Sequence, residues 1–255
     1  MTLNLVSAAI LGAVEGITEF LPISSTGHLI LAGKVLGIAQ TDFVKTFEIA
    51  IQLGAILAVI GIFWRKFFAK TTFLRVVTAF IPTAIIGFAL YKVIKDFLLG
   101  NTTVVAWSLL LGGLFLLAFE RRKHTPNEPQ TVLPTTKQAL LIGLVQSLAV
   151  IPGVSRSAAT IVAGLGLGMS RKSIVEFSFL LAVPTMVAAT GLDVIKSASQ
   201  FHASDTGVLA IGFLVAGITA FFAVRWLLRY VSTKTFTPFA YYRIVVGVLV
   251  LLLLR

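Results

Sequence analysis

The sequence predicts an all-α, polytopic membrane protein built from two inverted-topology repeats, each with one re-entrant helical hairpin and three transmembrane helices. Hydrophobic residues fill 57% of the 255 positions and charged residues 12%, whereas soluble domains carry about 25% charged residues. Apolar segments of membrane-spanning length recur along the whole chain, and two longer apolar segments are interrupted by a polar turn. The composition predicts a bilayer environment, and the segments predict the spans and the hairpins.

The first repeat is predicted to occupy residues 1–119. Its apolar segment at about 5–32 is broken by the sequence Leu-Pro-Ile-Ser-Ser-Thr-Gly at 21–27, and each half is shorter than the roughly 20 residues that a span requires. A re-entrant hairpin fits, because irregular backbone at membrane depth is tolerated only where protein buries it or a wet cavity borders it. Three uninterrupted spans follow at about 43–63, 73–94 and 102–119.

The second repeat is predicted to occupy residues 138–255, after a polar linker at 120–137. Its apolar segment at about 138–168 is broken by a proline and a glycine at 152–153, so it is predicted to form a second re-entrant hairpin. Three spans follow at about 174–195, 206–228 and 237–254.

The two repeats match in the order of their breaks, acids and serines. Glu15 corresponds to Gln146, Pro22 to Pro152, Ser25 to Ser155 and Glu48 to Glu176. An odd number of spans in each repeat inverts the second copy relative to the first. Broken helices of inverted repeats meet near the bilayer midplane, where substrate sites of such proteins lie.

Positive charge is concentrated on one predicted side of the membrane. A net charge of +11 would suggest nucleic acid in a soluble protein, but lysines and arginines in the loops of a polytopic protein set its orientation. Most of them fall on the side of the linker, which is therefore predicted to be cytoplasmic. Both termini and the mouth of the first hairpin then face outward, and no nucleic-acid partner is expected. The chain has no cysteine, which excludes thiolate chemistry.

An arginine and three hydroxyl side chains lie inside the second hairpin, in the run Pro-Gly-Val-Ser-Arg-Ser-Ala-Ala-Thr at 152–160. The break before them predicts the start of a new helix, whose free N–H groups attract anions. Arg156 adds a guanidinium suited to phosphate, and Gly153 permits close approach of the backbone. The run predicts a phosphate site, with a structural ion pair of Arg156 as the alternative. The expected hydroxyl donors are Ser155, Ser157 and Thr160.

Four acids fall within apolar segments, where an ionisable residue is a functional candidate by default. Glu15 and Glu19 share one helix face, so their carboxylates are predicted either to hold a divalent cation or to shuttle protons. Glu48 and Glu176 lie near span starts, where acids also stabilise helix termini. Arg243, in the last predicted span, lacks polar neighbours in the sequence and is expected to snorkel or to pair locally.

The first hairpin turn carries the run Ser-Ser-Thr-Gly-His at 24–28. Ser25 and His28 are three residues apart, which places them on adjoining positions of a helix. A hydroxyl beside an imidazole is a minimal pair of nucleophile and base, and a structural histidine in a polar turn is the alternative. The other members of the run that are predicted to bind substrate are Ser24, Thr26 and Gly27.

The motifs of both turns resemble those of the undecaprenyl-diphosphate phosphatases of the BacA type, which are associated with bacitracin resistance. The acidic motif at 15–19, the Pro-Ile-Ser-Ser-Thr-Gly-His box at 22–28 and the PGxSRSxxT motif at 152–160 all match, and the resemblance covers the whole chain. It implies removal of the terminal phosphate of undecaprenyl diphosphate, which recycles the lipid carrier for peptidoglycan synthesis. It further implies a divalent cation (Mg²⁺ or Ca²⁺) and an active site in the bacterial plasma membrane that opens to the outer face.

The mechanism that these residues suggest joins both hairpins. Arg156 and its neighbours would hold the diphosphate, while Glu15 and Glu19 would position the cation. Ser25 would attack phosphorus with Glu19 or His28 taking its proton; a phosphohistidine at His28 and direct attack by water are the rival routes. A transporter or flippase of a phosphorylated polyprenyl lipid is the alternative function, and the sequence leaves open whether the protein forms a homodimer.

Overall fold

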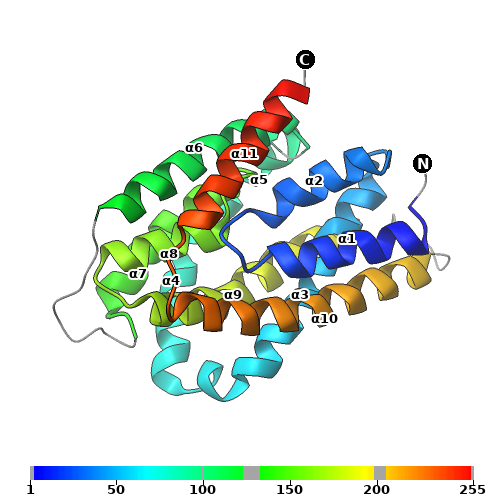
Figure 1. Ribbon diagram of the computed structural model, residues 1–255. Coiled ribbons are helices and arrows are strands. Elements are labelled where there is room, and N and C mark those ends of the chain that lie inside the picture. Colours follow the sequence, from blue (N-terminus) through cyan, green and yellow to red (C-terminus); the bar gives the residue numbers. More distant parts are fainter. Residues whose placement is uncertain (1–2, 99, 123–132, 198–204, 254–255) are drawn as a thin grey trace.

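The computed structural model describes residues 3–98, 100–122, 133–197 and 205–253 (Figure 1). Every regular element in these ranges is a helix, which confirms the predicted all-α class. Five helices are long and apolar enough to cross a bilayer, as a polytopic membrane protein requires. They are α3 (Asp42–Phe67), α4 (Lys70–Ala89), α6 (Thr102–Arg121), α9 (Arg171–Ser197) and α10 (Thr206–Val231). The last helix, α11 (Thr237–Leu253), is shorter, with 17 residues.

The first broken segment forms two short helices, α1 (Leu5–Thr18) and α2 (Ser25–Val35). Asn4 begins α1 through a capping box, in which its Oδ1 accepts from the Ser7 N–H and the Ser7 hydroxyl oxygen accepts from the Asn4 N–H. Caps of this kind satisfy N–H groups that the first helical turn leaves free. Ser24 caps α2, so the polar turn between the two helices covers residues 19–24.

The second broken segment has the same plan. It contains α7 (Thr136–Gln146), a 3₁₀ turn η2 (Ser147–Val150) and α8 (Arg156–Gly166). Thr135 and Gln138 form a capping box at the start of α7, and Ser155 caps α8. Most of the predicted linker, 123–132, lies outside the described residues.

One predicted span ends earlier than expected. The apolar segment at 73–94 continues past Ala89, where α4 ends, into α5 (Tyr91–Val93) and a π-helical turn η1 (Ile94–Leu98). The last residues of the predicted span include Lys92 and lie beyond the end of α4.

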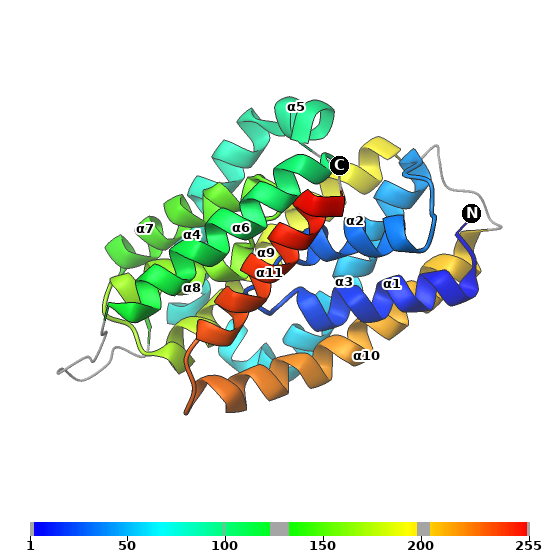
Figure 2. The ribbon, with the colours of Figure 1, turned by 45° about the horizontal axis from the view of Figure 1, so that its top comes forward.

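Each hairpin packs against a long helix of the other half of the chain: α1 lies along α10, and α7 lies along α4 (Figures 1 and 2). Glycines make both contacts close. A Cβ on Gly12 would collide with the carbonyl of Gly212, and a Cβ on Gly143 would collide with the carbonyl of Ala79. The first hairpin thus packs on a helix of the second half, and the second hairpin packs on a helix of the first half. Neither hairpin is held by its own half alone.

The remaining long helices pair across the halves as well, α3 with α9 and α6 with α11. The largest buried apolar cluster draws side chains from both halves. Phe20, in the first turn, lies edge-on to Phe179 of α9 with 5.2 Å between ring centres. Because the core draws on both halves of the chain, the turns of the two hairpins are held in one packed unit.

Candidate active site

Ser24 and Ser155 share an unusual backbone conformation at the two hairpin turns. Their φ angles are 72° and 75°, in the left-handed region that costs a residue with a Cβ about 1–3 kcal/mol. Each serine caps the helix that follows it. The Ser24 hydroxyl accepts from the N–H of Gly27, and the Ser155 hydroxyl accepts from the N–H of Ala158. The sequence alignment pairs Ser25 with Ser155, but the backbone pairs Ser24 with Ser155, a register one residue different.

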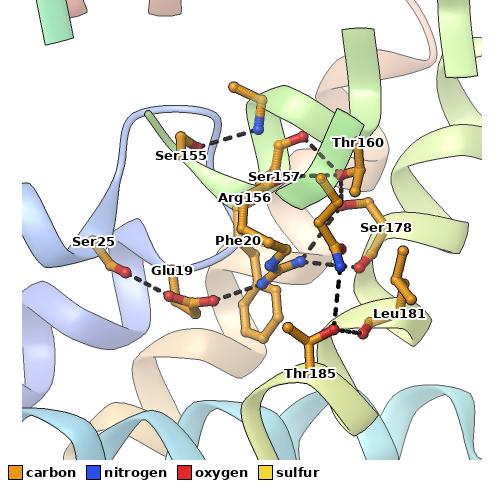
Figure 3. A network of polar contacts seen from close by, with 12 residues as sticks. Glu19, Phe20, Ser25, Ser155, Arg156, Ser157, Thr160, Ser178, Leu181 and Thr185 are labelled. Carbon is orange, nitrogen blue, oxygen red and sulfur yellow. Dashed lines mark hydrogen bonds and ion pairs between the residues drawn. The ribbon is translucent and has the colours of Figure 1, made fainter. Parts of the chain in front are cut away.

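In this register Ser25 and Arg156 occupy equivalent positions, as the first residues of α2 and α8. Glu19 joins them (Figure 3). Its Oε2 accepts from the Ser25 hydroxyl at 2.5 Å, and its Oε1 accepts from Nη2 of Arg156 at 2.5 Å. The side chains of Glu19 and Arg156 are only 6% and 10% exposed, and withdrawal from water strengthens such charged hydrogen bonds.

Further contacts fix the Arg156 guanidinium in place. Nη1 donates to the carbonyl of Ser178 in α9 at 2.9 Å, and the guanidinium carbon lies 5.8 Å from the centre of the Phe20 ring. The hydroxyls of Ser178 and Thr160 are hydrogen-bonded at 2.6 Å. Arg156 therefore forms the ion pair that was the alternative interpretation of its sequence, and it also borders a cavity.

The cavity has a volume of about 750 Å³ and lies between the two turns and the helices α4 and α9. Glu19, Ser25 and Arg156 all line it, as do four other residues predicted to bind substrate: Ser24, Thr26, Gly153 and Ser155. Much of the remaining wall is apolar, with side chains that include Phe80, Ile85, Phe88, Met186 and Leu192. A polar group with a long apolar substituent matches this lining.

The other three predicted substrate contacts do not border the cavity. The Ser157 hydroxyl donates to the Phe20 carbonyl at 2.9 Å, and the Thr160 hydroxyl bonds backbone carbonyls of its own helix as well as Ser178. Gly27 faces Val105, whose Cγ1 would lie 3.1 Å from an added Cβ. In this arrangement all three support the turns instead of facing a ligand.

His28 is engaged away from Ser25. Its Nδ1 donates to the Ser24 carbonyl at 2.7 Å, and its Nε2 is hydrogen-bonded to the Tyr242 hydroxyl at 2.8 Å. The imidazole also stacks on the Tyr242 ring, with 5.5 Å between the centres. The partner of the Ser25 hydroxyl is thus Glu19 and not His28, which places the histidine in support of the first turn.

Glu15 is fully buried one helical turn before Glu19. Neither of its carboxylate oxygens has a hydrogen-bond partner among the described residues, and such an unpaired buried carboxylate is costly. No group of three or more acidic or histidine side chains able to hold a metal occurs in the described part of the chain. Glu15 does not border the cavity, whereas Glu19 does, so a cation held by both acids would meet substrate oxygens and water only on the side of Glu19, as the remaining ligands that Mg²⁺ commonly takes.

The other two intramembrane acids have separate partners. Glu48 accepts from the side-chain amide of Gln40 at 3.2 Å, and Glu176 pairs with Lys66 at 2.6 Å. Neither borders the cavity.

Sequence reasoning assigned no role to two polar residues near the site. Ser178 accepts a hydrogen bond from Arg156 through its carbonyl, and it lies two residues after Glu176. Gln146 lines the cavity and donates to the hydroxyls of Thr83 and Thr185 at 2.8 and 3.3 Å. Its position as the counterpart of Glu15 was a signal that could have identified it.

The geometry supports attack by a hydroxyl on an anionic centre. A serine hydroxyl that is hydrogen-bonded to a carboxylate can act as a nucleophile with the carboxylate as its base. A buried guanidinium next to both can stabilise negative charge on a group that is being transferred. The apolar wall of the cavity favours an apolar substituent on that group.

The chain is similar to known proteins along nearly its whole length. The family model described as "Bacitracin resistance protein BacA" matches residues 8–249. A protein of Sulfurihydrogenibium sp. named undecaprenyl-diphosphatase is 52% identical over 95% of this chain and 96% of its own length. Proteins with the same name from Aquifex aeolicus (51% identity, 94% of each chain) and Wolinella succinogenes (47%, 98% of each chain) are also similar.

Proposed function

The chain belongs to the family of the bacitracin resistance protein BacA, and from this premise we propose that it is an undecaprenyl-diphosphatase of the membrane. It hydrolyses undecaprenyl diphosphate to undecaprenyl phosphate and orthophosphate, which returns the lipid carrier to peptidoglycan synthesis. The observation that carries this proposal is the position of Glu19, bonded to both Ser25 and Arg156 on the wall of a largely apolar cavity.

The cavity suits both parts of this substrate. The diphosphate would lie against Arg156 and the start of α8, where N–H groups and a guanidinium favour an anion. The polyprenyl chain would follow the apolar wall toward Ile85 and Phe88 of α4, which are 64% and 75% exposed. Exposed apolar side chains of a membrane helix face lipid, so the tail can leave the protein there.

In the proposed reaction, Ser25 Oγ attacks the terminal phosphorus and Glu19 takes the hydroxyl proton. The bond between the terminal phosphorus and the bridging oxygen breaks, and undecaprenyl phosphate leaves with the bridging oxygen. Water then attacks the phosphoserine, orthophosphate is released, and the Ser25 oxygen regains a proton. Arg156 stabilises the charge on the transferring phosphoryl group in both steps.

Glu15 and Glu19 would hold the divalent cation, Mg²⁺ or Ca²⁺. The unpaired carboxylate oxygens of Glu15 support this assignment, since a buried carboxylate without a donor is stabilised by a metal ion. The cation would supply positive charge against the diphosphate oxygens.

The proposed location is the bacterial plasma membrane, with the active site reached from the outer face. The distribution of lysine and arginine between the two predicted sides supports this orientation. The transporter hypothesis is not favoured, because the curated relatives carry the name of a phosphatase.

The test is release of orthophosphate from undecaprenyl diphosphate by the purified, full-length protein in detergent. We expect hydrolysis by the wild type, loss of hydrolysis in Ser25→Ala, and wild-type rates in Ser232→Ala, an exposed serine at the end of α10. A wild type that releases no phosphate from this substrate would refute the proposed function.

A further inference from the structure

Arg243, in the middle of α11, is the largest fully buried side chain among the described residues. The expectation that it snorkels or pairs locally is wrong, because its exposed fraction is 0% and its partners lie far away in the sequence. No carboxylate pairs with it in the part of the chain that the structure describes. A buried cation of this kind needs other compensation.

Backbone carbonyls supply that compensation. Nη1 donates to the carbonyls of Pro22 and Val154 at 3.2 and 2.9 Å. Nη2 donates to the carbonyls of Gly153 and Ser108 at 3.0 and 3.1 Å. Pro22 belongs to the first hairpin turn, and Gly153 and Val154 belong to the second. One guanidinium therefore ties both turns to each other and to α6.

The helix facing Arg243 is shaped to admit it. A Cβ on Gly112 of α6 would collide with Nη2 and lie 2.9 Å from the guanidinium carbon. A Cβ on the next residue, Gly113, would lie 3.0 Å from the Cβ of Arg243. The position of the guanidinium thus depends on two adjacent glycines of α6, because the absence of a Cβ on each leaves room for the Arg243 side chain.

The carbonyls that Arg243 holds lie close to the reacting groups in the sequence. Pro22 stands between Glu19 and Ser25 in the first turn, and Gly153 and Val154 lead directly into Ser155 and Arg156. Gly153, Ser25 and Arg156 border the cavity, but Arg243 does not. Arg243 therefore contacts the backs of both turns and not the substrate space.

We propose that Arg243 is a positioning residue, which fixes the two hairpin turns relative to each other so that Glu19, Ser25 and Arg156 meet. The catalytic part of this inference rests on the proposed function. The planar fork of arginine can serve four carbonyls at once, whereas the ammonium of lysine has three donors and cannot span the same set. Without the guanidinium the turn carbonyls lose their buried partners, and the turns are free to separate.

The test compares Arg243→Lys with the wild type, and uses Arg229→Lys, an exposed arginine of α10, as the matched control. We expect kcat to fall about 100-fold, since a displacement near 1 Å costs that much, with KM little changed because the diphosphate ligands remain. Amide hydrogen exchange should become faster in both turns, at 19–28 and at 151–158, while the rest of the protein keeps its protection. The control should change neither kcat nor exchange.

Gly112→Ala provides a second route if Arg243→Lys does not fold, because it displaces the guanidinium while keeping its charge. Its matched control is Gly61→Ala, where nothing lies within 4 Å of an added Cβ. Wild-type kcat in folded Arg243→Lys or Gly112→Ala, or faster exchange in only one turn, would overturn the inference. The exchange measurement needs no substrate, so it tests the bridge even if the proposed hydrolysis fails.

Discussion

Glu19 accepts a hydrogen bond from the Ser25 hydroxyl across the first hairpin turn, with 2.5 Å between Oε2 and Oγ. The other oxygen of this carboxylate holds Arg156 from the second hairpin. A single acid thus links the proposed nucleophile to the proposed phosphate ligand. Because neither hairpin contains all three groups, the reaction depends on the packing of the two halves.

Replacing Glu19 with glutamine should remove the base while keeping the size of the side chain. We expect kcat for phosphate release to fall about 10²–10⁴-fold, the usual contribution of a positioned base. Glu176→Gln is the control, because its partner Lys66 is 59% exposed and such pairs contribute little. The assignment fails if Glu19→Gln retains more than a tenth of the wild-type kcat.

Replacing Arg156 with lysine should keep the charge and lose the paired contacts to Glu19 and Ser178. We expect kcat/KM to fall about 10²–10³-fold, as for the loss of a donor to a developing anion. Arg171→Lys is the control, since Arg171 pairs with Glu120 away from the cavity. Equal losses in the two variants would mean that charge pairing stabilises the fold and has no specific role in catalysis.

Removal of the divalent cation tests the role of Glu15. A chelator should abolish phosphate release, and Mg²⁺ or Ca²⁺ should restore it. Glu15→Gln should raise the cation concentration for half-maximal activity about tenfold or more, since even outer ligands change metal affinity by 10–100-fold. An unchanged cation requirement in Glu15→Gln would favour the alternative, in which the two acids shuttle a proton.

The close approach of α1 and α10 predicts an effect on stability. Gly12→Ala would place a methyl group against the Gly212 carbonyl, and overpacking of this kind costs about 1–3 kcal/mol. Gly61→Ala adds the same methyl group in open space and should leave stability equal or slightly higher. Thermal unfolding in detergent measures the difference, and equal midpoints for the two variants would contradict the packing described.

The sequence predicted the helical class, both breaks and seven of the residues that border the cavity, whereas Glu15, His28 and three predicted substrate contacts lie outside its wall. Pro22, and Pro152 with Gly153, mark the two breaks by their residue type alone. A charged residue within an apolar segment is likewise recognisable from the sequence. The register of the two turns was missed by one residue, because it depends on the backbone angles of Ser24 and Ser155. The sequence also left open whether Ser25 pairs with Glu19 or with His28, because both residues lie within six positions of Ser25 in the chain.

Arg243 shows why the remaining features could not be predicted. Its partners are backbone carbonyls from three distant segments, and a carbonyl has no signature in the sequence. The same holds for the Ser178 carbonyl that fixes Arg156. Contacts of side chains with distant backbone are created by the packing of the halves and become visible only in the structure.

The most direct test of the central claim is the site of phosphorylation during turnover. The protein is mixed with undecaprenyl diphosphate, quenched rapidly, and its peptides are examined by mass spectrometry under conditions that preserve both phosphoserine and phosphohistidine. Glu19→Gln serves as a control in which the phosphoryl group should not appear. We predict phosphoserine at Ser25, and a phosphoryl group on His28, or full activity in Ser25→Ala, would contradict the account.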